Sequence, residues 1–89
     1  MPQVKVPPPY RGPTGGRALI EVPGTSIREC IEAVERECPG FGELVIDAAG
    51  RPQKFVTLFI NGDEVARDDL DAAVGSDDEV EVLAAIAGG

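Results

Sequence analysis

Histidine is absent from this sequence of 89 residues. Because histidine supplies the usual general base near neutral pH and the commonest metal ligand, its absence argues against a protein that catalyses a reaction with its own side chains. A chain of this length allows one domain with a single small core, too little for a fold that also encloses a large substrate pocket. The sequence therefore predicts a protein that is not an enzyme and that binds no cofactor of its own.

Basic residues are also scarce. Eight Lys and Arg stand against sixteen Asp and Glu, which gives a formal net charge of −8. This balance argues against nucleic acid as a partner, and no basic stripe with interleaved aromatic residues is present. The acids Asp77, Asp78, Glu79 and Glu81 lack the spacing and the glycine of a calcium loop, so no metal site is predicted.

Long apolar runs and a disulfide framework are absent as well. The only cysteines, Cys30 and Cys38, fall in one helical pattern, where a rise of ~1.5 Å per residue places them ~12 Å apart, too far to form a disulfide with each other. With no signal peptide and no membrane span, a cytoplasmic location is expected, without a membrane partner. No histidine activates either thiol, so Cys30 is interpreted as a core residue and Cys38 as a helix-end residue.

The acidic residues are unevenly placed along the chain. Residues 1–16 contain no acid, whereas nine acids follow Asn61 against Arg67 alone. These acids can simply be solvated loop residues. Alternatively, they lie near the C-terminal tail and steer it toward a basic docking surface, an attraction that would weaken with added salt.

Local patterns predict two strands and a helix in the first half of the chain. Residues 3–6 and 17–22 have strand character and are joined through a long, proline-stiffened connection, which predicts a hairpin. Ser26, with Glu29 three residues later, is a reciprocal capping pair that begins a helix, and Pro39 and Gly40 end it. Its apolar face is made of Ile27, Cys30, Ile31, Val34 and Cys38.

The second half is predicted to contain mainly strands. Residues 41–53 form a weakly patterned connection, in which Leu44, Val45 and Ile46 are expected to tuck under the domain. Residues 54–60 are a strand that Asn61-Gly62 closes with a strong hairpin signal. Val65 is expected to begin a short return strand, and a final strand follows Asp78.

The last two long strands offer an apolar surface. Alternation along residues 54–60 separates Val56, Leu58 and Ile60, which suit the helix, from the opposite face with Phe55, Thr57 and Phe59. In the final strand Val80 and Val82 point inward, so Leu83 points outward. If the two strands share a sheet, the predicted docking residues Phe55, Phe59 and Leu83 form one patch beside the tail.

The sequence finishes on Gly88 and Gly89, and the Gly89 carboxylate is the best functional candidate. Two glycines without Cβ atoms can pass through a slot too narrow for side chains, so such a tail can enter the active site of another protein. We predict a domain over residues 1–84 and a flexible C-terminal Gly-Gly tail over residues 85–89. A frayed terminus without a role is the plain alternative.

The order of elements, together with the ending of the chain, resembles the MoaD and ThiS family of ubiquitin-like sulfur carriers. The resemblance covers nearly the whole chain, and the segments 13–16, 55–61 and 85–89 look closest to the longer branch typified by the cysteine-synthase carrier CysO. It implies an α+β fold, the ubiquitin-like β-grasp, with a mixed sheet of four to five strands crossed by one helix.

The resemblance also implies a mechanism. An ubiquitin-activating-like adenylating enzyme consumes ATP to adenylate the Gly89 carboxylate, and sulfide or a persulfide displaces AMP to leave a thiocarboxylate. The tail residues Ala85, Ile86, Ala87 and Gly88 would thread the active site of the enzyme ahead of Gly89, with Ile86 anchored in an apolar groove. Phe59 and Leu83 would seat the sheet against the enzyme. The sulfur acceptor implied is a synthase, either cysteine synthase-like with a zinc peptidase that releases cysteine, or ThiG-like with a thiazole or thiosugar product.

Other functions stay open at this point. A ubiquitin-like modifier would use the same adenylation but form an isopeptide bond with a lysine. A molybdopterin synthase small subunit is a further alternative, although Ala84 and Ala85 stand where that branch commonly has two prolines. An acyl carrier protein is disfavoured because Ser26 follows threonine and the chain has strand patterns. A plain interaction domain would tolerate loss of Gly89.

Overall fold

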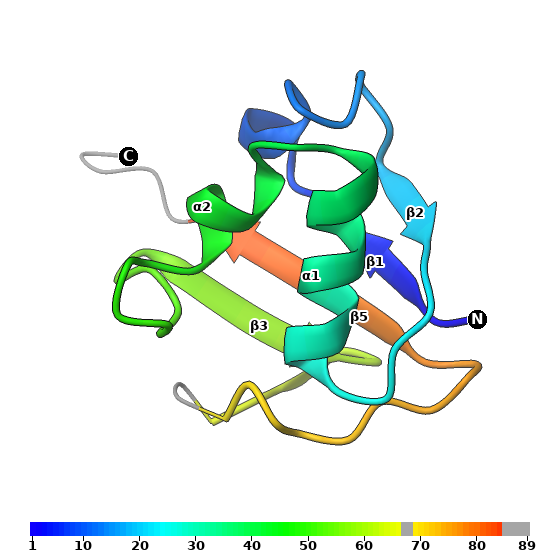
Figure 1. Cartoon of the computed structure of the whole chain (residues 1–89). Coiled ribbons are helices and arrows are strands. Elements are labelled where there is room, and N and C mark those ends of the chain that lie inside the picture. Colours follow the sequence, from blue (N-terminus) through cyan, green and yellow to red (C-terminus); the bar gives the residue numbers. More distant parts are fainter. Residues whose placement is uncertain (67–68, 85–89) are drawn as a thin grey trace.

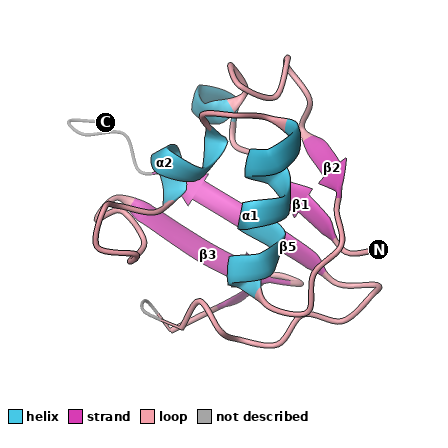
Figure 2. Cartoon of the chain, viewed as in Figure 1, coloured by secondary structure: helices cyan, strands magenta, loops and turns pink. Residues whose placement is uncertain are grey.

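A helix crosses one face of a five-stranded sheet in the computed structural model of the chain (Figure 1). The structure describes residues 1–66 and 69–84. Figure 2 separates the helices from the strands. The elements, in chain order, are β1 (Gln3–Lys5), the 3-10 helix η1 (Pro8–Tyr10), β2 (Leu19–Glu21), α1 (Ile27–Glu37), α2 (Phe41–Val45), β3 (Val56–Ile60), β4 (Asp63–Glu64) and β5 (Glu79–Ala84).

The sheet is mixed, with the strand order β2-β1-β5-β3-β4. β1 and β5 run parallel at its centre, whereas β2 pairs antiparallel with β1, and β3 pairs antiparallel with both β5 and β4. This arrangement confirms the predicted α+β fold and the predicted N-terminal hairpin. Within the described ranges, no helix is long and apolar enough to cross a membrane.

The start of α1 follows the predicted capping pair with one difference. Ser26 Oγ accepts a hydrogen bond from the Glu29 backbone N–H at 3.2 Å, as expected for an N-cap. The Glu29 carboxylate, however, reaches past Ser26 and accepts from the backbone N–H and the hydroxyl of Thr25, at 2.8 and 2.9 Å. These two side chains thus bond the backbone N–H groups of Thr25 and Glu29, while those of Ile27 and Arg28 donate to the Ala72 and Leu70 carbonyls.

The core lies between α1 and the sheet. The predicted apolar face of the helix is buried throughout, and so are the inward residues Val80 and Val82 of β5. Cys30 is fully buried, as predicted, and burial together with the nearby Glu29 carboxylate raises the pKa of its thiol. Cys38 is also buried and caps the end of α1.

The connection between α1 and β3 is more ordered than the sequence indicated. It begins with the short helix α2, and Phe41 at its start has an exposed fraction of 0%. The Glu35 carboxylate accepts hydrogen bonds from the backbone N–H groups of Gly40 and Gly42 and so fixes α2 against α1. The sequence placed no helix here because five residues carry too little periodicity to be read.

The return strand after the Asn61-Gly62 turn also differs from the prediction. Both turn residues have positive φ, 51° and 85°, as a two-residue hairpin turn requires. β4 then consists of Asp63 and Glu64, and Val65 follows it instead of beginning it. The Val65 backbone N–H still donates to the Leu58 carbonyl at 2.9 Å, so the chain leaves the sheet one residue later.

Candidate functional site at the end of β5

β5 positions the candidate site because it carries the chain to residues 85–89. It is paired on both sides along its first half, and its last residue, Ala84, lies opposite Val56 at the start of β3. We call this end of the sheet, where β5 and β1 end and β3 and β2 begin, the tail-root end. The predicted functional residues Ala85, Ile86, Ala87, Gly88 and Gly89 lie outside the described residues.

Pairing between β1 and β5 stops three residues before Ala84. The last paired residues are Lys5 and Glu81. The Gln3 N–H points to β5 and the Val6 N–H points to β2, so Pro7 is the next residue of the chain that faces β5. Pro7 has no N–H, and its carbonyl accepts from the Tyr10 N–H at 2.9 Å, so it cannot continue the ladder. Among the described residues, β5 is therefore paired only with β3 at Ala84.

Two of the three predicted docking residues, Leu83 and Phe59, lie on the sheet face opposite α1, and Phe55 lies in the turn before β3. Leu83 is 43% exposed and lies opposite Thr57, so Phe59 is its diagonal neighbour across the strand pair. Phe59 is partly buried and lies opposite Glu81. Phe55 is 49% exposed and comes directly before β3. The patch is bordered by an ion pair of Lys5 with Glu81, at 3.9 Å.

The acidic residues near the C-terminus in sequence lie far from the tail root in space. The segment 61–78 joins the end of β3 to the start of β5, and the Asn61 N–H donates to the Glu79 carbonyl there. Ala84 is at the other end of β5, and a strand rises about 3.3 Å per residue. Seven of the nine acids therefore belong to the segment 61–78, at the end of β5 opposite Ala84, and their steering of the tail toward a basic surface stays a prediction.

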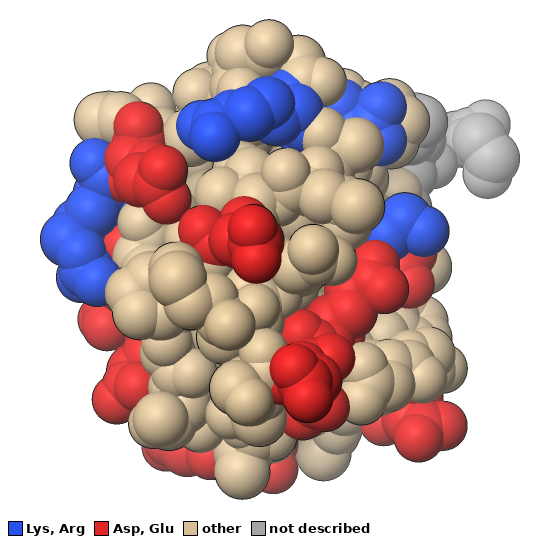
Figure 3. Space-filling model, turned by 90° about the vertical axis from the view of Figure 1, so that its right-hand side faces the viewer, with Lys and Arg blue, Asp and Glu red and all other residues tan. Residues whose placement is uncertain are grey.

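The connecting segments at the tail-root end contain more basic than acidic residues. Its connecting segments, 6–18 and 38–55, contain four basic residues (Arg11, Arg17, Arg51 and Lys54) and two acidic residues (Glu43 and Asp47). In the face shown in Figure 3, basic side chains gather mainly in the upper part and acidic side chains mainly in the lower part. By sequence, the segments at the tail-root end thus have a surplus of basic residues, whereas the segment 61–78 at the other end of β5 has a surplus of acidic residues.

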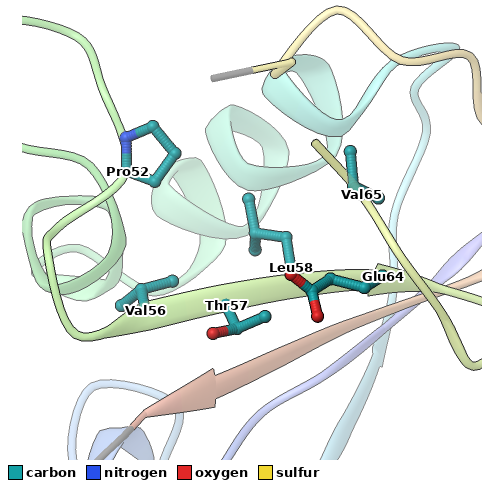
Figure 4. A pocket seen from close by; sticks show the side chains of 6 residues that line it. All are labelled: Pro52, Val56, Thr57, Leu58, Glu64 and Val65. Carbon is teal, nitrogen blue, oxygen red and sulfur yellow. The ribbon is translucent and has the colours of Figure 1, made fainter. Parts of the chain in front are cut away.

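Two of the hollows on the described surface lie beside β3 and along α1 and α2. A pocket of about 90 Å³ lies beside β3, where Leu58 lies between Pro52 and Val65 (Figure 4). Small-molecule sites usually occupy roughly 300–1,000 Å³. A larger, open groove of about 670 Å³ lies along α1 and α2, but one of its carboxylates, Glu35, is occupied by backbone amides. No group of three His, Cys, Asp or Glu that could hold a metal ion occurs in the described part of the chain.

A model of one protein family matches nearly the whole sequence, including the final Gly88 and Gly89. Residues 4–89 match the family model described as the ThiS family. The chain belongs to the ThiS family. Comparison of the sequence with curated proteins gives no significant match. The family match confirms the predicted membership of the MoaD and ThiS group.

Solved structures similar to this ThiS-family chain include two that concern CysO. A chain of the BexX/CysO complex from Amycolatopsis orientalis is 28% identical, with a TM-score of 0.92 and complete coverage of both chains. CysO from Mycobacterium tuberculosis is 26% identical, with a TM-score of 0.88 over 97% of this chain and all of CysO. These similarities confirm the predicted placement closest to the CysO-like branch.

A third structure shares the fold alone. SAMP1 from Haloferax volcanii is 20% identical, with a TM-score of 0.78 over 99% of this chain and 98% of SAMP1. Other similar structures include a small archaeal modifier protein from Methanosarcina acetivorans. The ubiquitin-like β-grasp predicted for the chain is thus confirmed.

Proposed function

We propose that this ThiS-family protein is a sulfur carrier whose Gly89 carboxylate is adenylated and converted into a thiocarboxylate. The single observation that supports this most is the match to the ThiS family over residues 4–89, which includes the Gly-Gly sequence. The protein is then a co-substrate of other enzymes and not a catalyst. Its own residues supply the carboxylate and the surface by which partners bind.

The proposed chemistry has two steps. In the first, an oxygen of the Gly89 carboxylate attacks the α-phosphorus of ATP on the adenylating enzyme, and pyrophosphate leaves. In the second, sulfide attacks the carbonyl carbon of the acyl adenylate, the C–S bond forms, and AMP leaves. A carboxylate is a poor electrophile until it is adenylated, whereas the thiocarboxylate product is a soft nucleophile that delivers sulfur.

The described residues support delivery of the tail to a partner. Leu83 and Phe55 remain exposed at the tail-root end, so a partner that covers them is brought to the start of residues 85–89. An apolar cluster at the centre of an interface is where binding energy concentrates. Phe59 extends this cluster along β3, where it is partly buried. We propose that Phe55, Phe59 and Leu83 form the docking surface for the adenylating enzyme.

The proposed acceptor is a sulfur-transfer synthase. CysO of Amycolatopsis orientalis is recorded in a complex with BexX, and by analogy this chain would also act through a protein partner. A cysteine synthase-like enzyme, followed by a zinc peptidase, and a ThiG-like synthase are the two acceptor classes to compare. Each would take sulfur from the same thiocarboxylate.

The test is intact mass of the purified chain after incubation with ATP, sulfide and the adenylating enzyme of the host cell. We expect the mass to rise by the difference between sulfur and oxygen. A chain that lacks Gly89 serves as the control, because its carboxylate then belongs to Gly88 and is one residue short. No mass change with an enzyme that is active on another carrier would contradict the proposal.

A ubiquitin-like modifier is the second candidate, because the fold is shared with small archaeal modifier proteins. Both functions need the adenylated Gly89. They differ in product, since a lysine amine that attacks the adenylate gives an isopeptide bond and a conjugate of higher mass. Such conjugates in a cell extract, without the thiocarboxylate, would favour the modifier.

A further inference from the structure

Two basic residues, Lys54 and Arg11, belong to the connecting segments at the tail-root end. Lys54 comes two residues before Val56, which pairs with Ala84, so Lys54 lies on the β3 side. Arg11 lies on the β1 side, where its Nε donates to the Val6 carbonyl at 3.1 Å. Val6 directly follows Lys5, the last residue of β1, and Lys5 pairs with Glu81. Lys54 therefore lies in the segment before β3 and Arg11 in the segment after β1, on the edge of β1 that faces β2.

Neither cation is neutralised by a carboxylate of the described residues. The ion pairs there are Lys5 with Glu81, at 3.9 Å, and Arg28 with Asp71, at the opposite end of the molecule. Lys54 is exposed, and Arg11 is partly exposed. Both charges are thus available to a surface that approaches the tail root.

These cations are unusual in a chain with a net charge of −8. The surplus of acid is concentrated in the segment 61–78, at the far end of β5, so it does not screen the tail root at contact range. The Debye length is about 10 Å at 0.1 M salt. The connecting segments at the tail-root end carry a surplus of basic residues, in contrast to the negative net charge of the protein.

We infer that the tail-root cations Lys54 and Arg11 form a recognition surface for an acidic partner surface, made of Asp and Glu around the mouth of the cleft that receives the tail. The inference rests on the proposed function, because the partner is the adenylating enzyme proposed above. Charge complementarity supports it, since paired opposite charges at an interface speed productive association and reject surfaces of the wrong sign. Recognition of this kind adds to the apolar contacts of Leu83 and Phe55.

The test compares two charge reversals that change the net charge equally. Lys54→Glu reverses a charge at the tail root, and Arg28→Glu reverses one at the acidic end. Both leave the core untouched, because Lys54 is exposed and Arg28 is on the solvent side of α1, paired only with the exposed Asp71. The measured quantity is kcat/KM for ATP-dependent adenylation of each purified chain by the adenylating enzyme, with thermal unfolding as the check of folding.

We expect Lys54→Glu to lower kcat/KM about three- to tenfold at low salt, the range of a reversed charge at an interface rim. Arg28→Glu should leave kcat/KM near the wild-type value. Lys54→Arg, which keeps the positive charge, should do the same. The difference between the two reversals should shrink at high salt, because the screening length is only about 3 Å at 1 M. Arg11→Gln should lower kcat/KM in the same direction, by a smaller factor because it only removes a charge.

Three results would overturn the inference. Equal kcat/KM values for Lys54→Glu and the wild type would show that the adenylating enzyme does not recognise the tail-root cations. An equal loss for Arg28→Glu would show that net charge matters and location does not. If the wild-type chain itself is not adenylated by an enzyme proven active, the proposed function fails and the inference falls with it, an outcome distinct from the first two.

Discussion

The carboxylates of the exposed Glu29 and the partly exposed Asp78 hold turns of the chain by accepting backbone hydrogen bonds. The bond from the Thr25 backbone N–H, with a second from its hydroxyl, lowers the pKa of Glu29 below its ordinary value of 4.5. The Gly75 N–H at 2.8 Å, together with the Asn61 side-chain amide, lowers the pKa of Asp78 below 3.8. Hydrogen bonds to the charged form favour ionisation, so both bonds weaken when the carboxylates are protonated.

The lowered pKa values of Glu29 and Asp78 make the stability of the fold depend on pH. A pKa lowered by folding contributes stability that is fully present above the unfolded-state pKa and is lost as the pH falls through the folded-state value. Wild-type protein should therefore lose stability below about pH 4.5, and Glu29→Gln with Asp78→Asn should make this loss smaller. Urea unfolding as a function of pH measures it, with Glu32→Gln, an exposed position of α1, as the matched control. Identical pH profiles for the double variant and the wild type would contradict this account.

Phe41 is the buried residue that local patterns missed, and it offers a matched pair with Phe55. Phe41 is 0% exposed, whereas Phe55 is 49% exposed. We expect Phe41→Ala to lower the free energy of unfolding by about 3–5 kcal/mol, through lost burial and a cavity. Phe55→Ala should change it by less than about 0.5 kcal/mol, as surface substitutions usually do. Chemical denaturation measures both, and equal losses would place Phe55 in the core.

At the scale of elements, the sequence predicted what is decided locally. The helix that begins after Ser26 and the turn at Asn61-Gly62 depend on capping and on backbone conformations within a few residues, and both occur where they were predicted. The helix α2 was missed because it is stabilised by Glu35 and by burial of Phe41, which are tertiary contacts. The strand order β2-β1-β5-β3-β4 likewise depends on pairings between distant segments.

The end of the β1–β5 ladder gives a prediction about single amides. Since the Asn61 N–H bonds to the Glu79 carbonyl, odd-numbered residues of β5 direct their backbone groups to β3, and the Leu83 N–H is therefore in the β3–β5 ladder. The Ala84 N–H faces Pro7, whose carbonyl is already bonded to Tyr10. Amide hydrogen exchange followed by NMR should be slow at Leu83 and fast at Ala84. Comparable protection of the two amides would mean that another group bonds to Ala84.

For the whole molecule, position in the sequence was a poor guide to position in space. The acids of 61–78 are close to the tail along the chain, yet they lie at the end of β5 opposite Ala84, because the strand carries the chain from one end of the sheet to the other. The apolar patch was accessible to sequence reasoning, since alternation in two paired strands determines which face Leu83 and Phe59 occupy. The functional residues of 85–89 remain a prediction from the sequence and the family.

The sheet itself provides the control for the proposed docking surface. Leu83 and Leu19 are both exposed leucines, at 43% and 50%, but Leu19 is on β2, two strands away from β5 in the sheet order. Leu83→Asp should lower kcat/KM for adenylation at least tenfold, because it places a charge at the centre of a surface that must become dry. Leu19→Asp introduces the same charge outside that surface and should change kcat/KM by less than about twofold. Equal rates for the two variants would mean that the partner recognises the tail alone, and an equal loss would mean that it covers the sheet as far as β2.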